Sequence, residues 1–78
     1  MREIIKVKVL KDYKLELTFD NNAVKIKDMK PLLDKGVFKE LKDKNKFNSV
    51  KIKFGSVCWD GEIDLFPDEL YETSEEVK

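Results

Sequence analysis

Apolar and charged residues alternate in several short runs along the first part of the chain. The runs Ile5–Val9, Leu15–Phe19 and Val24–Ile26 each place an apolar residue at every second position. Because successive side chains of a strand point to opposite faces of a sheet, this period of two predicts three strands, each with one apolar face. The links between them are short, and Asp20-Asn21-Asn22 suits a tight turn. We therefore predict a three-stranded antiparallel meander.

The apolar spacing lengthens to three to five residues after Asp28, a residue type that favours the start of a helix. This pattern continues to Leu41, and Gly36 predicts a break that leaves two short helical pieces. A polar turn is expected at residues 42–46. The middle of the chain is therefore predicted to be helical.

Alternation returns from Val50 to Phe54, and Gly55-Ser56 predicts a tight turn into a second hairpin strand at Val57-Cys58-Trp59. Pro67 suits the first turn of a last short helix. Together these elements predict an α+β fold of two layers, with a mostly antiparallel sheet in the order β-β-β-α-β-β and helical segments on one face. The predicted core is Ile5, Val7, Val9, Leu15, Leu17, Phe19, Val24, Ile26, Leu32, Leu33, Phe38, Leu41, Phe47, Val50, Ile52, Phe54, Trp59, Ile63 and Leu65.

The length of 78 residues suits one domain, which we place at residues 1–72, followed by a frayed acidic tail at residues 73–78. The single cysteine excludes an internal disulfide. Nothing resembles a signal peptide, and no apolar stretch approaches the roughly 20 residues that span a bilayer. We therefore expect a cytoplasmic protein that is not embedded in a membrane.

Charge is unevenly distributed although the formal net charge is zero. Residues 1–54 hold fifteen Lys and Arg against eight Asp and Glu, whereas residues 55–78 hold eight acids and one lysine. Such segregation favours electrostatic docking to a partner. It does not by itself identify that partner.

Enzymatic chemistry is not supported by the residue types. The chain has no histidine, the side chain that most often transfers protons near neutral pH. Cys58 lacks a histidine base, so a space-filling role is favoured over a nucleophile. The carboxylates of Asp60, Glu62 and Asp64 suggest a calcium loop only superficially, because the central glycine and closing glutamate of such a loop are out of place. We predict no enzyme activity, no cofactor and no metal site.

A set of lysines alternates with the apolar positions of the predicted strands and would lie on the open sheet face: Lys6, Lys8, Lys25, Lys27, Lys51 and Lys53. Such a face could attract nucleic-acid phosphates. Sheet-based single-strand binders also present aromatic rings for base stacking, and none alternates outward here. A solvated face that keeps the sheet soluble is favoured, and a nucleic-acid-associated regulator is the alternative.

Aromatic and acidic residues gather near the end of the chain. The predicted partner-binding residues are Asp64, Phe66, Asp68, Glu69 and Tyr71. Tyrosine is among the residue types that most often anchor interfaces. The alternative, about equally supported, is that the rings only cap the core.

The order of elements and several motifs resemble a bacterial family known as domain of unknown function 2442. The resemblance rests on the segments Tyr13–Phe19 with Asp20-Asn21, Asp28 with Pro31-Leu32-Leu33, Gly36-Val37-Phe38 with Leu41, Phe47, Trp59-Asp60-Gly61, Asp64-Leu65, Pro67-Asp68 and Leu70-Tyr71. It implies a small α+β domain that sometimes precedes a helix-turn-helix, and genes arranged like toxin and antitoxin pairs. Because the sequence ends shortly after Tyr71, we expect no DNA-reading helix-turn-helix.

These observations predict a small cytoplasmic bacterial protein-interaction module, the antitoxin-like half of a two-protein system. The expected partner is a small basic protein, which the acidic end of the chain would attract. A homodimer is left open, and nucleic acid is the less favoured partner.

Overall fold

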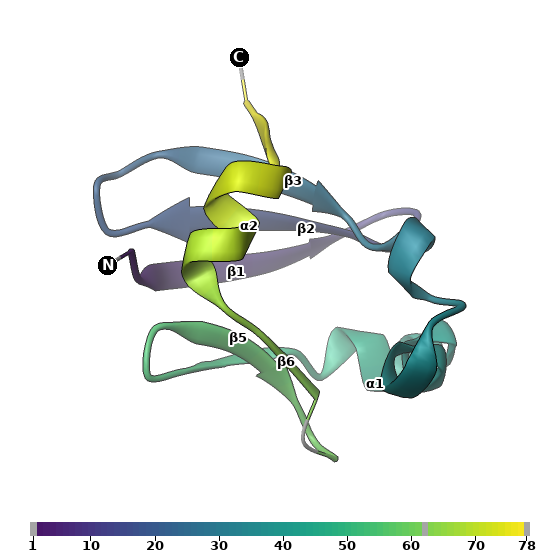
Figure 1. The fold of residues 1–78 in the computed structure, drawn as a ribbon. Coiled ribbons are helices and arrows are strands. Elements are labelled where there is room, and N and C mark those ends of the chain that lie inside the picture. The colour runs from purple at the N-terminus through teal and green to yellow at the C-terminus, as the bar shows by residue number, and fades with distance from the viewer. Residues whose placement is uncertain (1, 62, 78) are drawn as a thin grey trace.

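The computed structural model describes residues 2–61 and 63–77 and confirms the α+β class (Figure 1). No helix in this part of the chain is long and apolar enough to cross a membrane. The elements, of which η1 and η2 are 3-10 helices, are β1 (Ile4–Leu10), β2 (Lys14–Phe19), β3 (Val24–Asp28), η1 (Lys30–Leu32), η2 (Gly36–Lys42), α1 (Lys44–Asn48), β4 (Lys51–Lys53), β5 (Ser56–Trp59), β6 (Ile63–Leu65), α2 (Pro67–Thr73) and β7 (Glu75–Glu76).

The strands form two antiparallel sheets. The first has the order β1-β2-β3-β7 and contains the predicted meander, and the second has the order β4-β5-β6 and contains the predicted second hairpin. The two sheets meet where the backbone N–H of Ile4 donates to the carbonyl oxygen of Gly55, at 2.8 Å. A single sheet was predicted, whereas the strands form two sheets that meet between β1 and the β4–β5 turn.

Helix α2 lies over one face of the first sheet, while η1, η2 and α1 gather at one end of the molecule (Figure 1). Leu70 of α2 packs with buried side chains of β2 and of the second sheet in one core. That core is Ile4, Leu15, Leu17, Phe19, Met29, Leu33, Leu41, Phe47, Val57, Trp59, Ile63, Leu65 and Leu70. Both sheets thus depend on the same buried cluster.

The prediction that Ile5 faces the core is wrong. Ile4 is 1% exposed, whereas Ile5 is 57% exposed. The pairing of β1 with β2 shifts between Ile4 and Lys6, which is the signature of a β-bulge. A bulge adds one residue to its strand and so reverses the alternation of side chains across it. Val7 and Val9 remain on the inner face and pack against the core, as predicted.

The orientation predicted for β3 is also wrong. Lys25 pairs with Leu17, and Lys27 pairs with Leu15, so both lysines lie on the inner face. Val24 and Ile26 therefore lie on the outer face and are only half-buried. Lys25 is 7% exposed, and its ammonium group donates to the carbonyl oxygen of Tyr71 at 2.5 Å. A lysine can bury its aliphatic stem when its charged end finds such an acceptor.

Three smaller predictions also need correction. Phe54 was predicted to face the core but is 90% exposed. β4 ends at Lys53, so Phe54 lies at the tip of the β4–β5 turn and not in the strand. The region predicted as a polar turn, residues 42–46, includes the start of α1, whose first turn is capped by the Asp43 carboxylate accepting from the N–H of Asn45. The tail, for which fraying was predicted, contains β7, paired with Lys25 and Ile26 of β3.

Candidate partner-binding site

Helix α2 presents a row of acids to solvent. Pro67 occupies its first turn, where the missing N–H costs nothing, and Asp68 and Glu69 follow near the positive end of the helix dipole. Leu70, on the opposite side, is buried in the core. This division fixes the helix on the sheet with its carboxylates outward.

Four of the five predicted partner-binding residues are exposed. Asp64 lies on β6 between two buried neighbours, and Phe66, Asp68 and Glu69 follow it into α2. Phe66 is 62% exposed, which is high for a large apolar side chain. The ion pairs within residues 2–61 and 63–77 involve other acids, so these three carboxylates face no lysine or arginine partner there.

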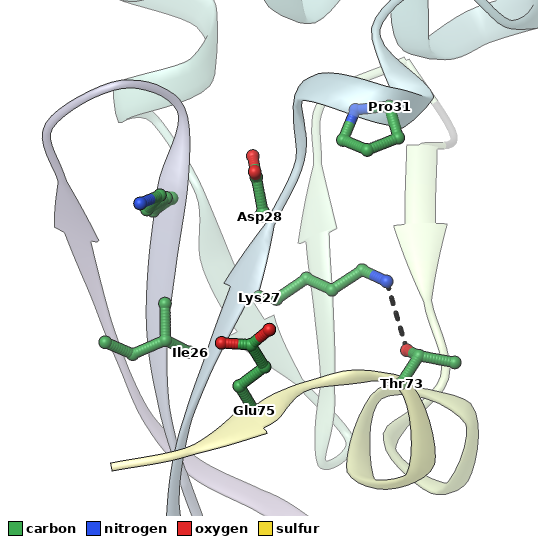
Figure 2. Close-up of a pocket in the computed structure, with 7 residues that line it drawn as sticks. Ile26, Lys27, Asp28, Pro31, Thr73 and Glu75 are labelled. Carbon is green, nitrogen blue, oxygen red and sulfur yellow. Dashed lines mark hydrogen bonds between the residues drawn. The ribbon is translucent and has the colours of Figure 1, made fainter. Parts of the chain in front are cut away.

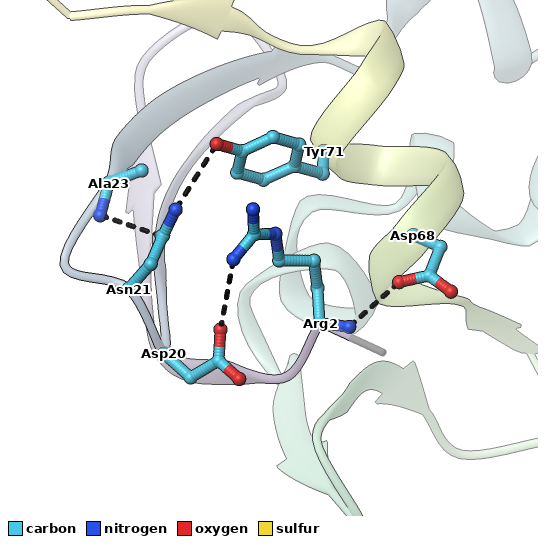
Figure 3. Close-up of polar contacts among 6 residues, drawn as sticks. All are labelled: Arg2, Asp20, Asn21, Ala23, Asp68 and Tyr71. Atoms are coloured by element: carbon cyan, nitrogen blue, oxygen red, sulfur yellow. Dashed lines mark hydrogen bonds and ion pairs between the residues drawn. The ribbon is translucent and has the colours of Figure 1, made fainter.

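Tyr71, the fifth predicted residue, is instead part of the structure that holds α2 on the sheet (Figure 3). Its ring meets Phe19 edge-on at 5.0 Å between centroids. The Arg2 guanidinium lies 4.5 Å from the ring centroid and the Lys25 ammonium 3.9 Å. Its hydroxyl oxygen accepts from the Asn21 side chain at 3.2 Å. Tyr71 is therefore engaged on several sides and only half-buried.

A cleft of about 240 Å³ opens beside Phe66. It brings together the start of the chain, the β4–β5 turn and the start of α2, three segments far apart in sequence. Its lining residues are Arg2, Glu3, Phe54, Ser56, Phe66, Pro67 and Asp68. The backbone N–H of Arg2 donates to the Asp68 carboxylate at 2.8 Å and fixes one wall. Two exposed phenylalanines therefore share one hollow with carboxylates.

Phe54 was missed as a site residue, although a signal was present. The β4–β5 loop has two residues, Phe54 and Gly55, with φ angles of 53° and 76°. Both lie in the left-handed region, where a two-residue hairpin loop prefers Asn-Gly. For a residue with a side chain this region costs roughly 1–2 kcal/mol. A phenylalanine directly before the glycine of a tight turn was the feature that could have indicated the site.

The sequence model of the family described as Protein of unknown function (DUF2442) matches residues 4–76, nearly the whole chain. The chain belongs to the DUF2442 family. No curated protein and no solved structure matches it.

The lysines predicted to form one face of the DUF2442 protein are dispersed. Lys6 and Lys8 are exposed on the outer face of β1, whereas Lys25 and Lys27 lie on the inner face of the same sheet. Lys51 and Lys53 are exposed, but they belong to the second sheet. Lys51 also pairs with Asp60, at 2.9 Å. The six side chains do not form the continuous field that was predicted.

A second pocket, of about 350 Å³, lies between β3, η1 and the end of α2 (Figure 2). Lys27 reaches across it and donates to the Thr73 hydroxyl at 3.1 Å. Lys14 and Lys27 are balanced there by Asp28 and Glu75. With two cations and two anions, this pocket has no net charge to select a charged ligand.

Of the residues that the structure describes, those considered for nucleophilic or metal chemistry do not come together in one site. Cys58 is half-buried on β5, where Lys51 and Asp64 are its neighbours on the adjoining strands. Glu62, one of the three carboxylates that superficially suggested a calcium loop, lies outside the described residues. Among residues 2–61 and 63–77, no group of three His, Cys, Asp or Glu could hold a metal ion.

Proposed function

We propose that this DUF2442 protein is a protein-interaction module that binds a basic partner through Asp64, Phe66, Asp68 and Glu69, here called the acidic face. The observation that carries this proposal is Phe66, a 62% exposed aromatic residue among carboxylates that have no ion partner in the described structure. Aromatic residues, phenylalanine among them, are enriched in protein–protein interfaces.

The two kinds of side chain have different roles in this mechanism. The carboxylates attract a basic surface over several ångströms and so raise the rate of encounter. The aromatic surface is desolvated only after contact, so it governs how long the complex persists. Tyr71 supports the face from beneath, because its ring is committed to Phe19, Arg2 and Lys25.

The family resemblance implies genes arranged like toxin and antitoxin pairs, and this suggests a biological role. We propose a non-enzymatic, cytoplasmic bacterial protein that acts as the antitoxin-like half of a two-protein system. In that role the acidic face would cover a basic surface of a small partner protein. The absence of histidine from the sequence is consistent with a binding role rather than proton transfer.

The test begins by reading the genes beside this one for a small basic protein, which is then co-expressed with the chain so that the complex can be purified. Reversing the charge at Asp68 and Glu69 should slow association and flatten its dependence on salt, as measured by stopped-flow or surface plasmon resonance. Phe66→Ala should mainly speed dissociation. The matched control is Asp34→Lys, which reverses an exposed acid elsewhere and should leave both rates unchanged.

Unchanged kinetics in both acidic-face variants would contradict the proposal. Binding of DNA or RNA at near-physiological salt, with a steep salt dependence that is lost when Lys6 and Lys8 are replaced, would favour a nucleic-acid role instead. Titrations of single- and double-stranded nucleic acid at two salt concentrations distinguish the two functions.

A further inference from the structure

We propose that the cleft between Phe54 and Phe66 receives one large apolar side chain of the partner, and that a lysine or arginine next to that side chain pairs with Glu3 and Asp68. This inference rests on the proposed function, because the cleft adjoins the acidic face and shares Phe66 and Asp68 with it. It adds a specific occupant, a basic segment with an apolar residue at its centre.

The size of the cleft favours a single side chain over a free small molecule. Its volume of about 240 Å³ is below the range of about 300–1,000 Å³ that is typical of small-molecule sites. It is also open to solvent between its two rings, since Phe54 and Phe66 are both largely exposed. A side chain anchored to a partner's backbone can fill such a hollow, because the partner covers the open side.

Phe54 lies on a turn whose backbone is anchored to the rest of the fold. The turn that carries it is tied to β1 by the hydrogen bond from Ile4 to Gly55. Glu3 packs so closely that a Cβ atom on Gly55 would lie 2.9 Å from the Glu3 Cγ atom. Because the backbone of the turn is already ordered, only the Phe54 side chain loses conformational freedom when a partner binds.

Phe54 also breaks two local rules at once. It takes a left-handed conformation that suits asparagine, and it exposes almost its whole ring to water. In the isolated chain the ring has the Lys53 ammonium 5.9 Å from its centroid, at the outer limit of a cation–π contact, while the left-handed backbone costs stability. A position that lowers stability for so small a structural gain is where a functional role is expected.

The charges at the cleft select a cation beside the apolar residue. Arg2 is already engaged, because its guanidinium lies over the Tyr71 ring and 4.0 Å from the Asp20 carboxylate. Glu3 is exposed, and Asp68 is bonded to a backbone N–H rather than to a cation. An incoming lysine or arginine would therefore meet carboxylates that no side-chain cation of the described residues neutralises.

The experiment titrates the full chain, labelled with ¹⁵N, with three short synthetic peptides. The first has a central leucine flanked by lysines, the second has serine in place of that leucine, and the third has glutamates in place of the lysines. We expect only the first to bind in the micromolar range and to shift the amide resonances of Phe54, Ser56 and Phe66. The serine peptide should bind at least about tenfold more weakly, the scale of losing one anchor residue.

Phe54→Asn is the decisive variant. It should raise the melting temperature, because asparagine suits the turn, and it should weaken the leucine peptide at least about tenfold. Greater stability together with weaker binding separates a partner-binding role from a structural one. Val37→Asn is the control, because Val37 is also exposed but does not line the cleft, and its affinity for the peptide should be unchanged.

Several outcomes would overturn this inference. If leucine and serine peptides bind equally well along α2, the acidic face stands as a partner site and the cleft does not. If Phe54→Asn binds the leucine peptide as tightly as the unaltered chain does, the cleft is likewise rejected as the site. Resonances of the cleft that shift with the concentration of the chain alone would show that a second copy occupies it. Failure of all peptides, together with unchanged kinetics after charge reversal on the acidic face, would reject the cleft and the proposed function together.

Discussion

Lys25 shows how one residue can reverse the apparent orientation of a strand. By alternation it belongs to the solvent side of β3, yet its stem packs against the core and its ammonium group reaches the carbonyl oxygen of Tyr71. That acceptor lies in the last turn of α2, where carbonyl groups have no partner within the helix. The bond thus satisfies a buried lysine and a helix end at once.

Leu17 and Ile5 provide a matched pair for testing which residues form the core. Leu17 is fully buried, so Leu17→Ala should lower the free energy of unfolding by about 2–5 kcal/mol through lost burial and a residual cavity. Ile5 is the unpaired residue of the bulge and is 57% exposed, so Ile5→Ala should change the free energy of unfolding by about 0.5 kcal/mol or less. Urea denaturation measures both, and a large loss at Ile5 would contradict the bulge.

The Lys51–Asp60 pair gives a pH-dependent prediction. The hydrogen bond and charge of Lys51 lower the pKa of the Asp60 carboxyl below its ordinary value, and Asp60 raises the pKa of Lys51. The contribution of Asp60 to stability is therefore present above its unfolded pKa and lost as pH falls through the folded one. NMR titration of the carboxyl should show the lowered pKa, and Lys51→Met should return it toward the ordinary value.

Among the elements, α2 depends on Tyr71 for its place on the sheet. Tyr71→Ala would remove the contact with Phe19 and the ring that Arg2 and Lys25 approach. We expect a loss of about 2–4 kcal/mol in stability, somewhat below a fully buried aromatic residue. Tyr71→Phe should cost less, because only the bond from Asn21 is lost. Thermal unfolding measures both changes, and an unaltered melting temperature for Tyr71→Ala would show that α2 is held by other contacts.

How much of these elements the sequence could predict depends on what sets each side-chain direction. In β2 the alternation alone was enough to predict which side chains face the core, because Leu15, Leu17 and Phe19 point inward without a bulge or a special contact. It was insufficient at Ile4 and Lys25, where a pairing shift and a distant carbonyl oxygen decide the direction. The acidic residues of the site were identifiable from composition, but Phe54 joins them only through the folded turn.

Over the whole molecule, the shared core predicts that both sheets unfold together. Phe47, Trp59 and Leu17 belong to one buried cluster, although they come from α1 and both sheets. Trp59 is the single tryptophan, and its indole N–H donates to the carbonyl oxygen of Phe47 at 2.9 Å. Its fluorescence therefore reports on the second sheet, whereas far-UV circular dichroism reports on all elements. The two signals should give the same urea midpoint, and an earlier fluorescence transition would show independent unfolding of the second sheet.

The position of Arg2 and Glu3 in the cleft has a practical consequence for how the protein is handled. An affinity tag or fusion partner placed directly before Arg2 would lie next to the cleft wall. Such a tag, especially one rich in lysine or histidine, would compete with a peptide for Phe54 and Phe66 and lower the measured affinity. The opposite end of the chain runs through β7, which pairs with β3 instead. Immobilisation and labelling for binding studies should therefore use the carboxyl terminus.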